Sequence, residues 1–205
     1  MKSANQAHWN QVFQTKPLDS VSWYEPVPTL SLRYIAEQHL PRQAQIIDVG
    51  GGDSLLVDHL LALGYINLTV LDISAQAIRR AQKRLGKQAS RVHWIISDIT
   101  SFESETRFDF WHDRAAFHFL TEEQQIGQYL SIASRSLHTG GILSVGTFSD
   151  KGPRHCSGLP VRQYTPDVLT ALFHQAFAKL YCEEVEHQTP WMTSQAFTFC
   201  QFRRM

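Results

Sequence analysis

A glycine-rich turn that follows a short apolar run constrains this chain more than any other feature. Residues 46–52 read IIDVGGG, ending in Gly50, Gly51 and Gly52, and a second apolar run ends at Asp72, twenty residues after the last glycine. A strand that breaks into glycines brings bare backbone close to a ligand. A carboxylate at the tip of the next strand can accept hydrogen bonds from both hydroxyls of a ribose. The combination predicts a site for an adenosine-containing cofactor.

Apolar, strand-like runs alternate with helical patterns from residue 44 onward. This alternation favours an α/β fold, in which helices cover both faces of a mostly parallel sheet. Strands are predicted at about 45–50, 67–72, 91–97, 107–112, 142–148, 178–186 and 196–203.

Four helices are predicted from one-sided apolar patterns and from signals at their ends. Ser74 and Thr165 are typical N-caps, and the Gly140-Gly141 pair predicts where the third helix stops. The predicted helices cover residues 55–63, 75–85, 121–137 and 165–176.

The chain length favours a single domain over residues 1–205, because a chain of 205 residues can bury roughly 70% of its unfolded surface. Residues 1–43 are expected to form an N-terminal cap or lid, and residues 44–148 the cofactor-binding core. Residues 149–205 are expected to supply a substrate loop and the closing strands. The loop, at 149–160, is too long for a plain connector and is a candidate binding loop.

The charge balance and the apolar runs disfavour several function classes. The chain has 19 basic and 19 acidic residues and a formal net charge of zero, whereas nucleic-acid-binding domains are usually basic. The N-terminus is polar, and the apolar runs are too short for a membrane span. We therefore expect a cytoplasmic protein, a monomer or weak dimer, with no nucleic-acid or membrane partner.

The cysteine pattern predicts no covalent or metal framework. Cys156, Cys182 and Cys200 are odd in number and form no CxxC pair. This spacing indicates neither a disulfide framework nor a zinc site, and no metal ligand is predicted.

The glycine turn departs from the fingerprint of dinucleotide-binding folds. That fingerprint, GxGxxG, needs a third glycine for close helix–strand packing, but Leu55 stands there. An acid inside the turn, Asp53, would also repel a pyrophosphate. Both departures suit a cofactor with a charged amino-acid end and no phosphate. An NAD-dependent oxidoreductase and a non-catalytic cofactor-binding protein remain as alternatives.

Three short motifs at successive strand ends carry a family resemblance. In chain order they are Asp48-x-Gly50-x-Gly52, Asp72 and Ser97-Asp98-Ile99. As a set they resemble the first three motifs of the class I S-adenosylmethionine-dependent methyltransferases, over about residues 44–148. The resemblance implies S-adenosyl-L-methionine as the cofactor and S-adenosyl-L-homocysteine as its product. It also implies a Rossmann-like, seven-stranded mixed sheet, with the last strand inserted antiparallel.

The resemblance assigns roles to single residues. The glycine turn would pack against the methionine and ribose, and Asp48 would orient the turn and the amino-acid end. Asp72 would hold the ribose hydroxyls, and Asp98 the adenine amino group, with Ile99 near the ring. The implied cofactor-binding residues are Asp48, Gly50, Gly51, Gly52, Asp72, Ile73, Asp98, Ile99 and Trp23.

Aromatic residues mark the N-terminal segment. Trp9 and Phe13, four residues apart, are expected to anchor a helix on the body of the protein. Trp23 and Tyr24 are the better candidates for reaching the cofactor or the methyl acceptor, and Tyr24 is assigned to substrate binding.

The predicted fourth strand ends in an unusually polar segment at the ligand-binding edge of the sheet. His112 and Asp113 are therefore the first candidates for substrate contact or proton handling, and Arg114 for substrate binding. Asp113 and Arg114 could instead form a local ion pair that shapes the turn. His118, among apolar neighbours, is expected to be a core residue rather than a base.

The sequence indicates the methyl acceptor less directly than the cofactor. Arg154 in the 149–160 loop could hold a substrate carboxylate or phosphate, or could simply be solvated. The fourth strand is not followed by the Asn-Pro-Pro-Tyr motif of enzymes that methylate amides or nucleobases. The predicted acceptor is an O, N or S nucleophile of a small molecule, with a protein lysine as the alternative.

Overall fold

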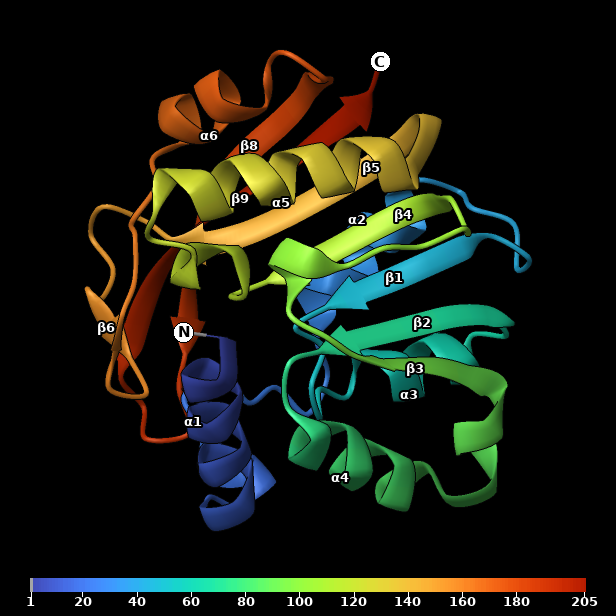
Figure 1. Cartoon of the computed structure of the whole chain (residues 1–205), viewed down its shortest axis with the longest axis vertical. Coiled ribbons are helices and arrows are strands. Elements are labelled where there is room, and N and C mark those ends of the chain that lie inside the picture. The colour runs from blue at the N-terminus through green and yellow to red at the C-terminus, as the bar shows by residue number, and fades with distance from the viewer. Residues whose placement is uncertain (1) are drawn as a thin grey trace.

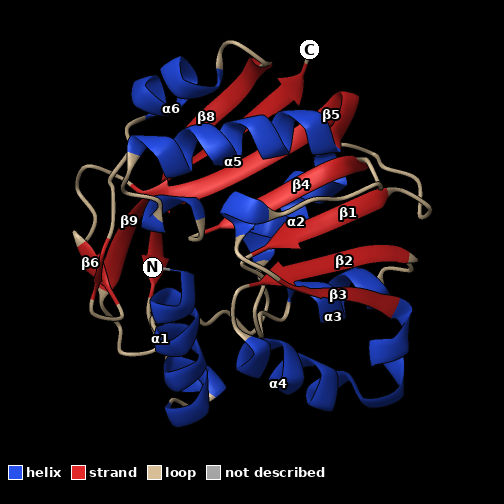
Figure 2. Cartoon of the chain, viewed as in Figure 1, coloured by secondary structure: helices blue, strands red, loops and turns tan. Residues whose placement is uncertain are grey.

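A seven-stranded sheet forms the centre of the molecule (Figures 1 and 2). The computed structural model describes residues 2–205. The strand order is β3-β2-β1-β4-β5-β9-β8, in which β9 is antiparallel to both of its neighbours and the other adjacent pairs are parallel. The strands are β1 (Gln45–Val49), β2 (Asn67–Asp72), β3 (Val92–Ile96), β4 (Phe108–Arg114), β5 (Leu137–Phe148), β8 (Phe177–Gln188) and β9 (Ser194–Arg204). The predicted mixed sheet, with its last strand inserted antiparallel, is confirmed.

Helices cover both faces of this sheet, as predicted (Figure 2). Buried residues of α5 and α6 pack into one hydrophobic core, and those of α2 and α3 pack into the other. The helices are α1 (Lys2–Thr15), α2 (Thr29–Glu37), α3 (Leu56–Ala62), α4 (Ala75–Leu85), α5 (Glu123–Ser136) and α6 (Pro166–Phe173).

The alternation of side chains along β1 explains why both cores form. Ile47 and Val49 point into the core beneath α5, whereas Ile46 points into the core shared with α2 and α3. Successive strand residues face opposite sides of a sheet. Full burial of each large apolar side chain contributes about 1.5–3 kcal/mol, so a continuous apolar run of this kind favours a strand covered on both faces.

Two of the predicted helix starts are confirmed in detail. The Ser74 hydroxyl accepts a hydrogen bond from the backbone N–H of Ala77, at 3.2 Å, and begins α4. Thr165 caps α6 in the same way through the N–H of Val168, at 3.3 Å, with Pro166 in the first turn. A hydroxyl at this position satisfies a donor that the helix itself leaves unpaired.

The end of α5 differs from the prediction. The helix ends at Ser136 and the chain enters β5 at once, so Gly140 and Gly141 lie inside a strand instead of stopping a helix. A Cβ at Gly141 would lie 2.9 Å from the carbonyl oxygen of His138. Gly141 is therefore explained by close backbone packing at an irregularity in the β4–β5 pairing, and Gly140 by its φ angle of +84°.

The N-terminal helix α1 is tied to α4 and to the end of β2 (Figure 1). The Gln6 amide donates to the carbonyl oxygen of Ile73 at 3.1 Å. The Asn10 side-chain oxygen accepts from the hydroxyl of Ser74, at 2.9 Å, and from the N–H of Gln76, at 3.1 Å. These contacts place α1 beside the carboxyl end of β2, at the edge where the cofactor site is predicted.

The prediction that the cysteines form no disulfide is wrong for one pair. Cys182 on β8 and Cys200 on β9 lie directly opposite each other and are joined by a disulfide, while Cys156 is free. Their sequence separation of 18 residues carries no local signature. The pairing follows from strand register, which a β-bulge between Lys179 and Tyr181 shifts by one residue.

Residues 149–160 are not wholly irregular. They contain a small hairpin of β6 (His155–Cys156) and β7 (Leu159–Pro160). Within residues 2–205, no helix has the length and apolar character needed to cross a membrane.

Candidate active site

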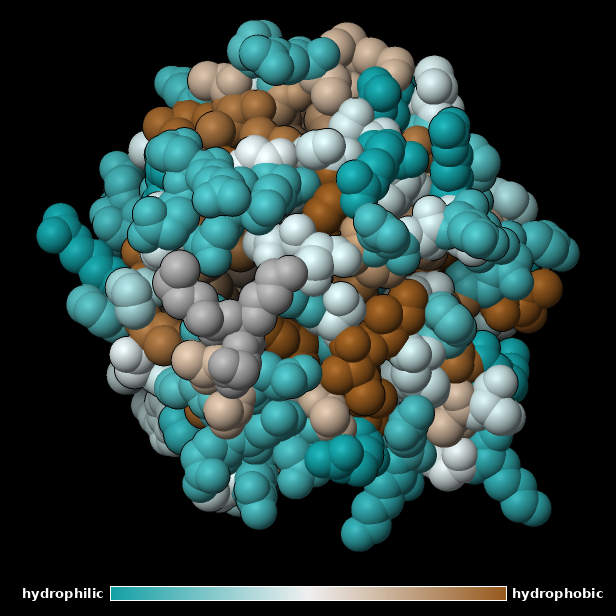
Figure 3. Space-filling model, in the orientation of Figure 1, coloured by the Kyte–Doolittle hydropathy of each residue, from teal (hydrophilic) through white to brown (hydrophobic). Residues whose placement is uncertain are grey.

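A cavity opens at the carboxyl edge of the parallel strands, where ligands bind in open α/β sheets. Its floor is formed by residues just after β1, β2, β3 and β4, and its cover by α1, the segment before α2, β6 and β9. Figure 3 shows hydrophobic side chains at the surface near the centre of the same view. Four strand ends thus meet at one site, although they are spread over about 65 residues of sequence, from Val49 to Arg114.

The glycine turn after β1 is as tight as the sequence predicts. Gly50 and Gly52 have φ angles of +65° and +51°, which residues other than glycine rarely adopt. A Cβ at Gly50 would lie 2.5 Å from the Cβ of Ala116, and one at Gly51 would lie 2.5 Å from a carboxylate oxygen of Asp48. Gly50 lines the cavity, whereas Gly51 and Gly52 pack beneath it.

Asp72, at the end of β2, lines the cavity although it is only 5% exposed. One carboxylate oxygen accepts a hydrogen bond from the N–H of Ser74, at 2.7 Å. Burial, together with the nearby carboxylates of Asp53 and Asp48, raises the pKa of Asp72 to about 7. Hydroxyl donors from a ligand would favour the charged form of this carboxylate.

Asp98 lies at the end of β3 on the same edge. One of its carboxylate oxygens accepts hydrogen bonds from the N–H and the hydroxyl of Thr100, at 2.8 and 2.7 Å. This fixes the side chain, and Asp98 lines the cavity together with Ile73 and Ile99. The structure therefore brings together six residues of the predicted cofactor set, namely Trp23, Gly50, Asp72, Ile73, Asp98 and Ile99.

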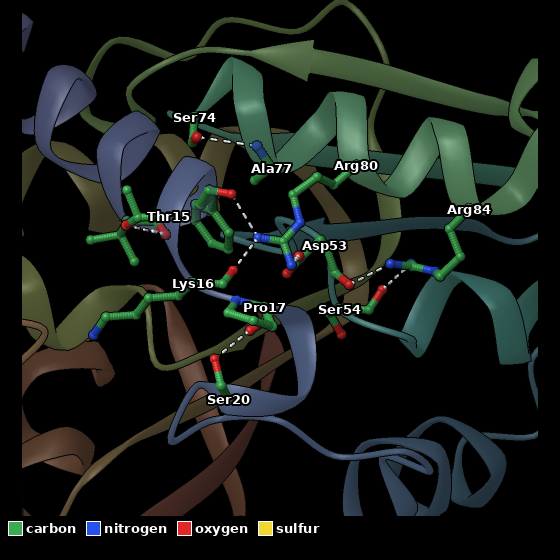
Figure 4. Close-up of polar contacts among 12 residues, drawn as sticks. Thr15, Lys16, Pro17, Ser20, Asp53, Ser54, Ser74, Ala77, Arg80 and Arg84 are labelled. Atoms are coloured by element: carbon green, nitrogen blue, oxygen red, sulfur yellow. Dashed lines mark hydrogen bonds and ion pairs between the residues drawn. The ribbon is translucent and has the colours of Figure 1, made fainter.

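The acid inside the turn, Asp53, is neutralised within the protein (Figure 4). Arg80 pairs with its carboxylate at 2.9 Å, and Arg84 donates to its backbone carbonyl at 2.7 Å. Arg84 also donates to the carbonyl of Ser54 and pairs with Asp58. The charge that was expected to repel a pyrophosphate is thus offset, and the argument against a dinucleotide rests on the missing third glycine.

Aromatic rings cover the cavity. Trp9 and Phe13 from α1 and Trp23 from the following segment all line it, as does Phe119. Trp9 contacts Trp23 and Phe119 edge to face, with ring centroids 6.0 and 5.0 Å apart. Trp23 thus lines the cavity at which the cofactor is predicted to bind. Trp9 and Phe13 reach the cavity as well as joining α1 to the body.

His112 does not reach the cavity, and its proposed role in proton handling needs correction. It is 3% exposed, and its Nδ1 lies 2.7 Å from the carboxylate of Asp48. Its Nε2 lies 2.8 Å from the hydroxyl of Ser31 on α2. Asp48, also buried, does not line the cavity. This Asp48–His112–Ser31 network ties α2 to the strand beneath the glycine turn.

Asp113 is also buried away from the cavity, against the expectation of substrate contact. One carboxylate oxygen accepts from the N–H groups of Ala116 and Phe117, each at 3.0 Å, and the other accepts from the hydroxyl of Tyr129 at 2.8 Å. Burial raises its pKa to about 6. Asp113 thus fixes the turn after β4, and it does so without the ion pair to Arg114 that was the alternative.

Arg114 lines the cavity but is held by the N-terminal segment. It pairs with Glu25 at 3.1 Å and donates to the backbone carbonyl of Trp23 at 2.8 Å. Tyr24 lines a neighbouring hollow instead of this cavity. Arg154 is exposed and does not line the cavity.

His118 is a core residue, as expected. It is fully buried, and its Nδ1 accepts the N–H of Phe148 at 3.2 Å. Burial lowers its pKa to about 3, so the ring is neutral at physiological pH. Among residues 2–205, no group of three or more His, Cys, Asp or Glu side chains is placed to hold a metal ion.

Several cavity residues carried no local sequence signal. They come from segments that only the fold brings together, and they lie in ordinary strand, turn and helix-start patterns. These residues are Ser22, Ala115, Ala116, Phe119, Leu120, Gln125, Phe148, Gln195 and Phe197.

Comparison with known proteins agrees with this geometry. The family model described as a methyltransferase domain matches residues 46–141. The chain is 26% identical over 141 residues to the eEF1A lysine and N-terminal methyltransferase of Bos taurus, covering 65% of this chain and 20% of that protein. It therefore spans about a fifth of that relative's length. It is 31% identical over 83 residues to nodulation protein S of Rhizobium tropici, covering 40% of this chain and 34% of that protein.

Two solved structures share the fold over nearly the whole chain. The N-methyltransferase NodS from Bradyrhizobium japonicum WM9, in complex with S-adenosyl-L-homocysteine, has a TM-score of 0.71 and 19% identity, covering 95% of this chain and 97% of that one. The 1,6-didemethyltoxoflavin-N1-methyltransferase of Burkholderia thailandensis has a TM-score of 0.74 and 19% identity, covering 100% and 91%. Together with the strand-end motifs, the family match shows that residues 46–141 are a methyltransferase domain.

Proposed function

We propose that the protein transfers a methyl group from S-adenosyl-L-methionine to an O, N or S nucleophile of a small molecule. The observation that carries this proposal is the convergence of Gly50, Asp72 and Asp98 on one cavity at the sheet edge. Three independent sequence motifs meet there, and each supplies the group that one part of the cofactor requires.

The residues of the cavity fit this cofactor. Asp72 would accept the ribose hydroxyls, and Asp98 has a second carboxylate oxygen available for the adenine amino group, since the Thr100 contacts use the first. Ile73 and Ile99 would pack on the adenine. The bare backbone at Gly50, which lines the cavity, would contact the methionine portion. When bound, the cofactor supplies an electrophilic methyl group on a positively charged sulfur.

The protein's own contribution to methyl transfer is positioning and exclusion of water. Trp9, Phe13 and Trp23 cover the cavity, so an acceptor would meet the methyl group in a dry site. His112 and Asp113 would act by holding the glycine turn and the β4 turn in place, because neither reaches the cavity. Asp48, Gly51 and Gly52 would likewise support the cofactor from beneath.

A protein lysine is the second candidate acceptor. The similarity to the eEF1A lysine and N-terminal methyltransferase, at 26% identity over 65% of this chain, favours it. The similarity to nodulation protein S and the shared fold with small-molecule enzymes support the first candidate.

We also propose that the chain works as one domain over residues 1–205, with residues 1–43 as its cap, 44–148 as its cofactor core and 149–205 as its acceptor side. The protein would act in the cytoplasm as a monomer or weak dimer, with no nucleic-acid or membrane partner. Arg114 and Tyr24 would line the approach to the acceptor side.

Calorimetry with S-adenosyl-L-homocysteine tests the cofactor assignment. We expect micromolar-range binding, weakened about tenfold or more in Asp72→Ala, because a hydrogen bond to a charged group contributes about 1.5–3 kcal/mol. Asp150→Ala, at an exposed acid outside the cavity, is the matched control and should bind like wild type. Absence of binding by the wild-type protein would refute the proposal.

Mass spectrometry can separate the two acceptor classes. A cell extract is incubated with isotopically labelled methyl donor and pure enzyme. Label in low-mass metabolites supports the small-molecule acceptor, and label confined to a protein band supports the lysine alternative.

A further inference from the structure

Aromatic rings line the half of the cavity that lies opposite Asp72 and Asp98. Trp23 lies before α2, Phe119 follows β4, Phe148 ends β5 and Phe197 lies on β9. Phe148 and Phe197 contact each other with centroids 4.8 Å apart. We call these four residues the aromatic wall. Rings favour flat, apolar or aromatic partners, through edge-to-face and offset-stacked contacts.

This half of the cavity presents no uncompensated charge among residues 2–205. The charged residues that line the cavity are Asp72, Asp98 and Arg114. The two acids lie on the cofactor side, and Arg114 is paired with Glu25 at 3.1 Å. A charged acceptor group would lose its hydration there without gaining an ion-pair partner, which is costly.

The rings are also not arranged as an open box for a cation. Trp23 contacts Trp9 and Phe13 edge to face, at centroid distances of 6.0 and 6.1 Å. Neighbouring rings therefore occupy part of the faces that an ammonium group would need for a cation–π contact.

No described residue of this half can serve as a general base. His118 is close in sequence, but it is neutral, fully buried and does not line the cavity. Cys156 does line it, but burial raises the pKa of its thiol. An acceptor that had to lose a proton before attack would find no group to take it. The nucleophilic atom must therefore hold a free lone pair at neutral pH.

Polar contacts in this half come from neutral groups. The Gln195 side-chain amide offers two N–H donors and a carbonyl acceptor, and Ser22 offers a hydroxyl. Both side chains are half-buried. They can bind one polar edge of a flat molecule and set its orientation, while the rings bind its faces.

On the basis of the proposed methyltransferase activity, we propose that the acceptor is an uncharged, flat heteroaromatic molecule that is methylated on a ring nitrogen. The nitrogen lone pair forms the new bond to the methyl carbon, and the electron pair of the breaking carbon–sulfur bond stays on the sulfur. The positive charge moves from sulfur to the methylated ring. No proton needs to leave before the transfer.

Three probes of similar size test this inference on the protein saturated with S-adenosyl-L-homocysteine, at pH 8. Isoquinoline is neutral, isoquinoline-3-carboxylate is an anion and 1-naphthylmethylamine is an ammonium cation. Tryptophan fluorescence reports binding, because Trp9 and Trp23 line the cavity. We expect isoquinoline to bind about tenfold or more tightly than either charged probe.

Two variants locate the bound probe. Gln195→Leu, at a half-buried position, should weaken isoquinoline binding several-fold while S-adenosyl-L-homocysteine binding is kept, and Phe197→Leu should do the same. Gln124→Leu, at an exposed position on α5, is the matched control and should change neither. If Gln124→Leu weakened isoquinoline binding as much as Gln195→Leu does, the placement of the probe beside Gln195 would be overturned.

The outcomes separate this inference from the proposed function. If S-adenosyl-L-homocysteine binds but isoquinoline does not, or a charged probe binds as tightly, the heteroaromatic inference is overturned and the proposed function stands. If S-adenosyl-L-homocysteine does not bind, the proposed function itself fails. With the labelled methyl donor, methylation of a lysine peptide as fast as isoquinoline also overturns the inference.

Discussion

The strand ends at the middle of the sheet and those toward its β3 edge carry the same residue type but use it differently. Asp48 on β1 and Asp113 on β4 are buried against other parts of the protein, and neither lines the cavity. Asp72 on β2 and Asp98, just after β3, both line it. An aspartate at the ligand-binding edge of a sheet is therefore not by itself a ligand-binding residue.

Asp113 differs from the two cavity acids in how its carboxylate oxygens are used. Both oxygens of Asp113 accept hydrogen bonds from within the chain, three in total. Asp98 uses one oxygen on Thr100, and Asp72 accepts from Ser74 through one oxygen. A carboxylate with all its partners inside stabilises a turn, whereas one with an oxygen toward a cavity can recognise a ligand.

Removal of the buried Asp113 carboxylate should have the largest effect on stability. Asp113→Ala leaves two N–H groups and the Tyr129 hydroxyl without their partner, so we expect a loss of roughly 3–5 kcal/mol in the free energy of unfolding. Urea denaturation measures this loss. The folded fraction should still bind S-adenosyl-L-homocysteine within about threefold of wild type, because Asp113 does not line the cavity. A stable variant with lost turnover would instead make Asp113 catalytic.

Asp72→Asn should show the opposite pattern, with weaker cofactor binding and a more stable apo-protein at high pH. The pKa of Asp72 is raised from 3.8 to about 7. Its contribution to stability is thus fully present below about pH 4 and is lost as the pH rises through 7. The variant should gain at most a few kcal/mol over wild type at pH 8, at 1.36 kcal/mol per pKa unit, and little at pH 4.5.

Urea denaturation of the apo-protein at the two pH values measures that gain, and calorimetry measures the expected loss of affinity, about tenfold or more. Asp150→Asn, at an exposed acid, is the control for the general effect of removing one negative charge. The same gain at both pH values would contradict the assignment of the raised pKa to Asp72.

Ser31→Ala should have a moderate effect, because it removes one partner of His112 and leaves Asp48 in place. We expect a loss of about 1 kcal/mol in stability and a several-fold weaker affinity for the cofactor. Thermal denaturation and calorimetry give the two values. A large fall in kcat at unchanged cofactor affinity would show that His112 acts on the reaction itself.

Arg154→Ala should have the smallest effect. Arg154 is exposed and does not line the cavity, and exposed substitutions usually change stability by less than about 0.5 kcal/mol. Turnover should stay within about twofold of wild type. A strong rise in KM for the acceptor would mean that the 149–160 loop moves over the cavity during binding.

The errors of sequence interpretation share a cause. The Cys182–Cys200 disulfide depends on the register of β8 against β9, and the place of Gly141 depends on its packing against the preceding strand. His112 was a candidate because it stands in the polar segment that ends the predicted fourth strand at the ligand-binding edge. Its partners, Asp48 and Ser31, lie 64 and 81 residues away in the sequence. Long-range contacts of this kind leave no local signal.

The sequence alone predicted the fold class and the seven strands of the sheet, because both depend on local patterns, and the family resemblance of its motifs implied the cofactor. Apolar runs, caps and the glycine turn act within a few residues, and Asp72 and Asp98 follow their strands directly. Only the tertiary structure decided which acids face the cavity and what lines the acceptor side. Gln195 and Phe197 reach that side from β9, about 140 residues after the glycine turn, and only strand order and register bring them there.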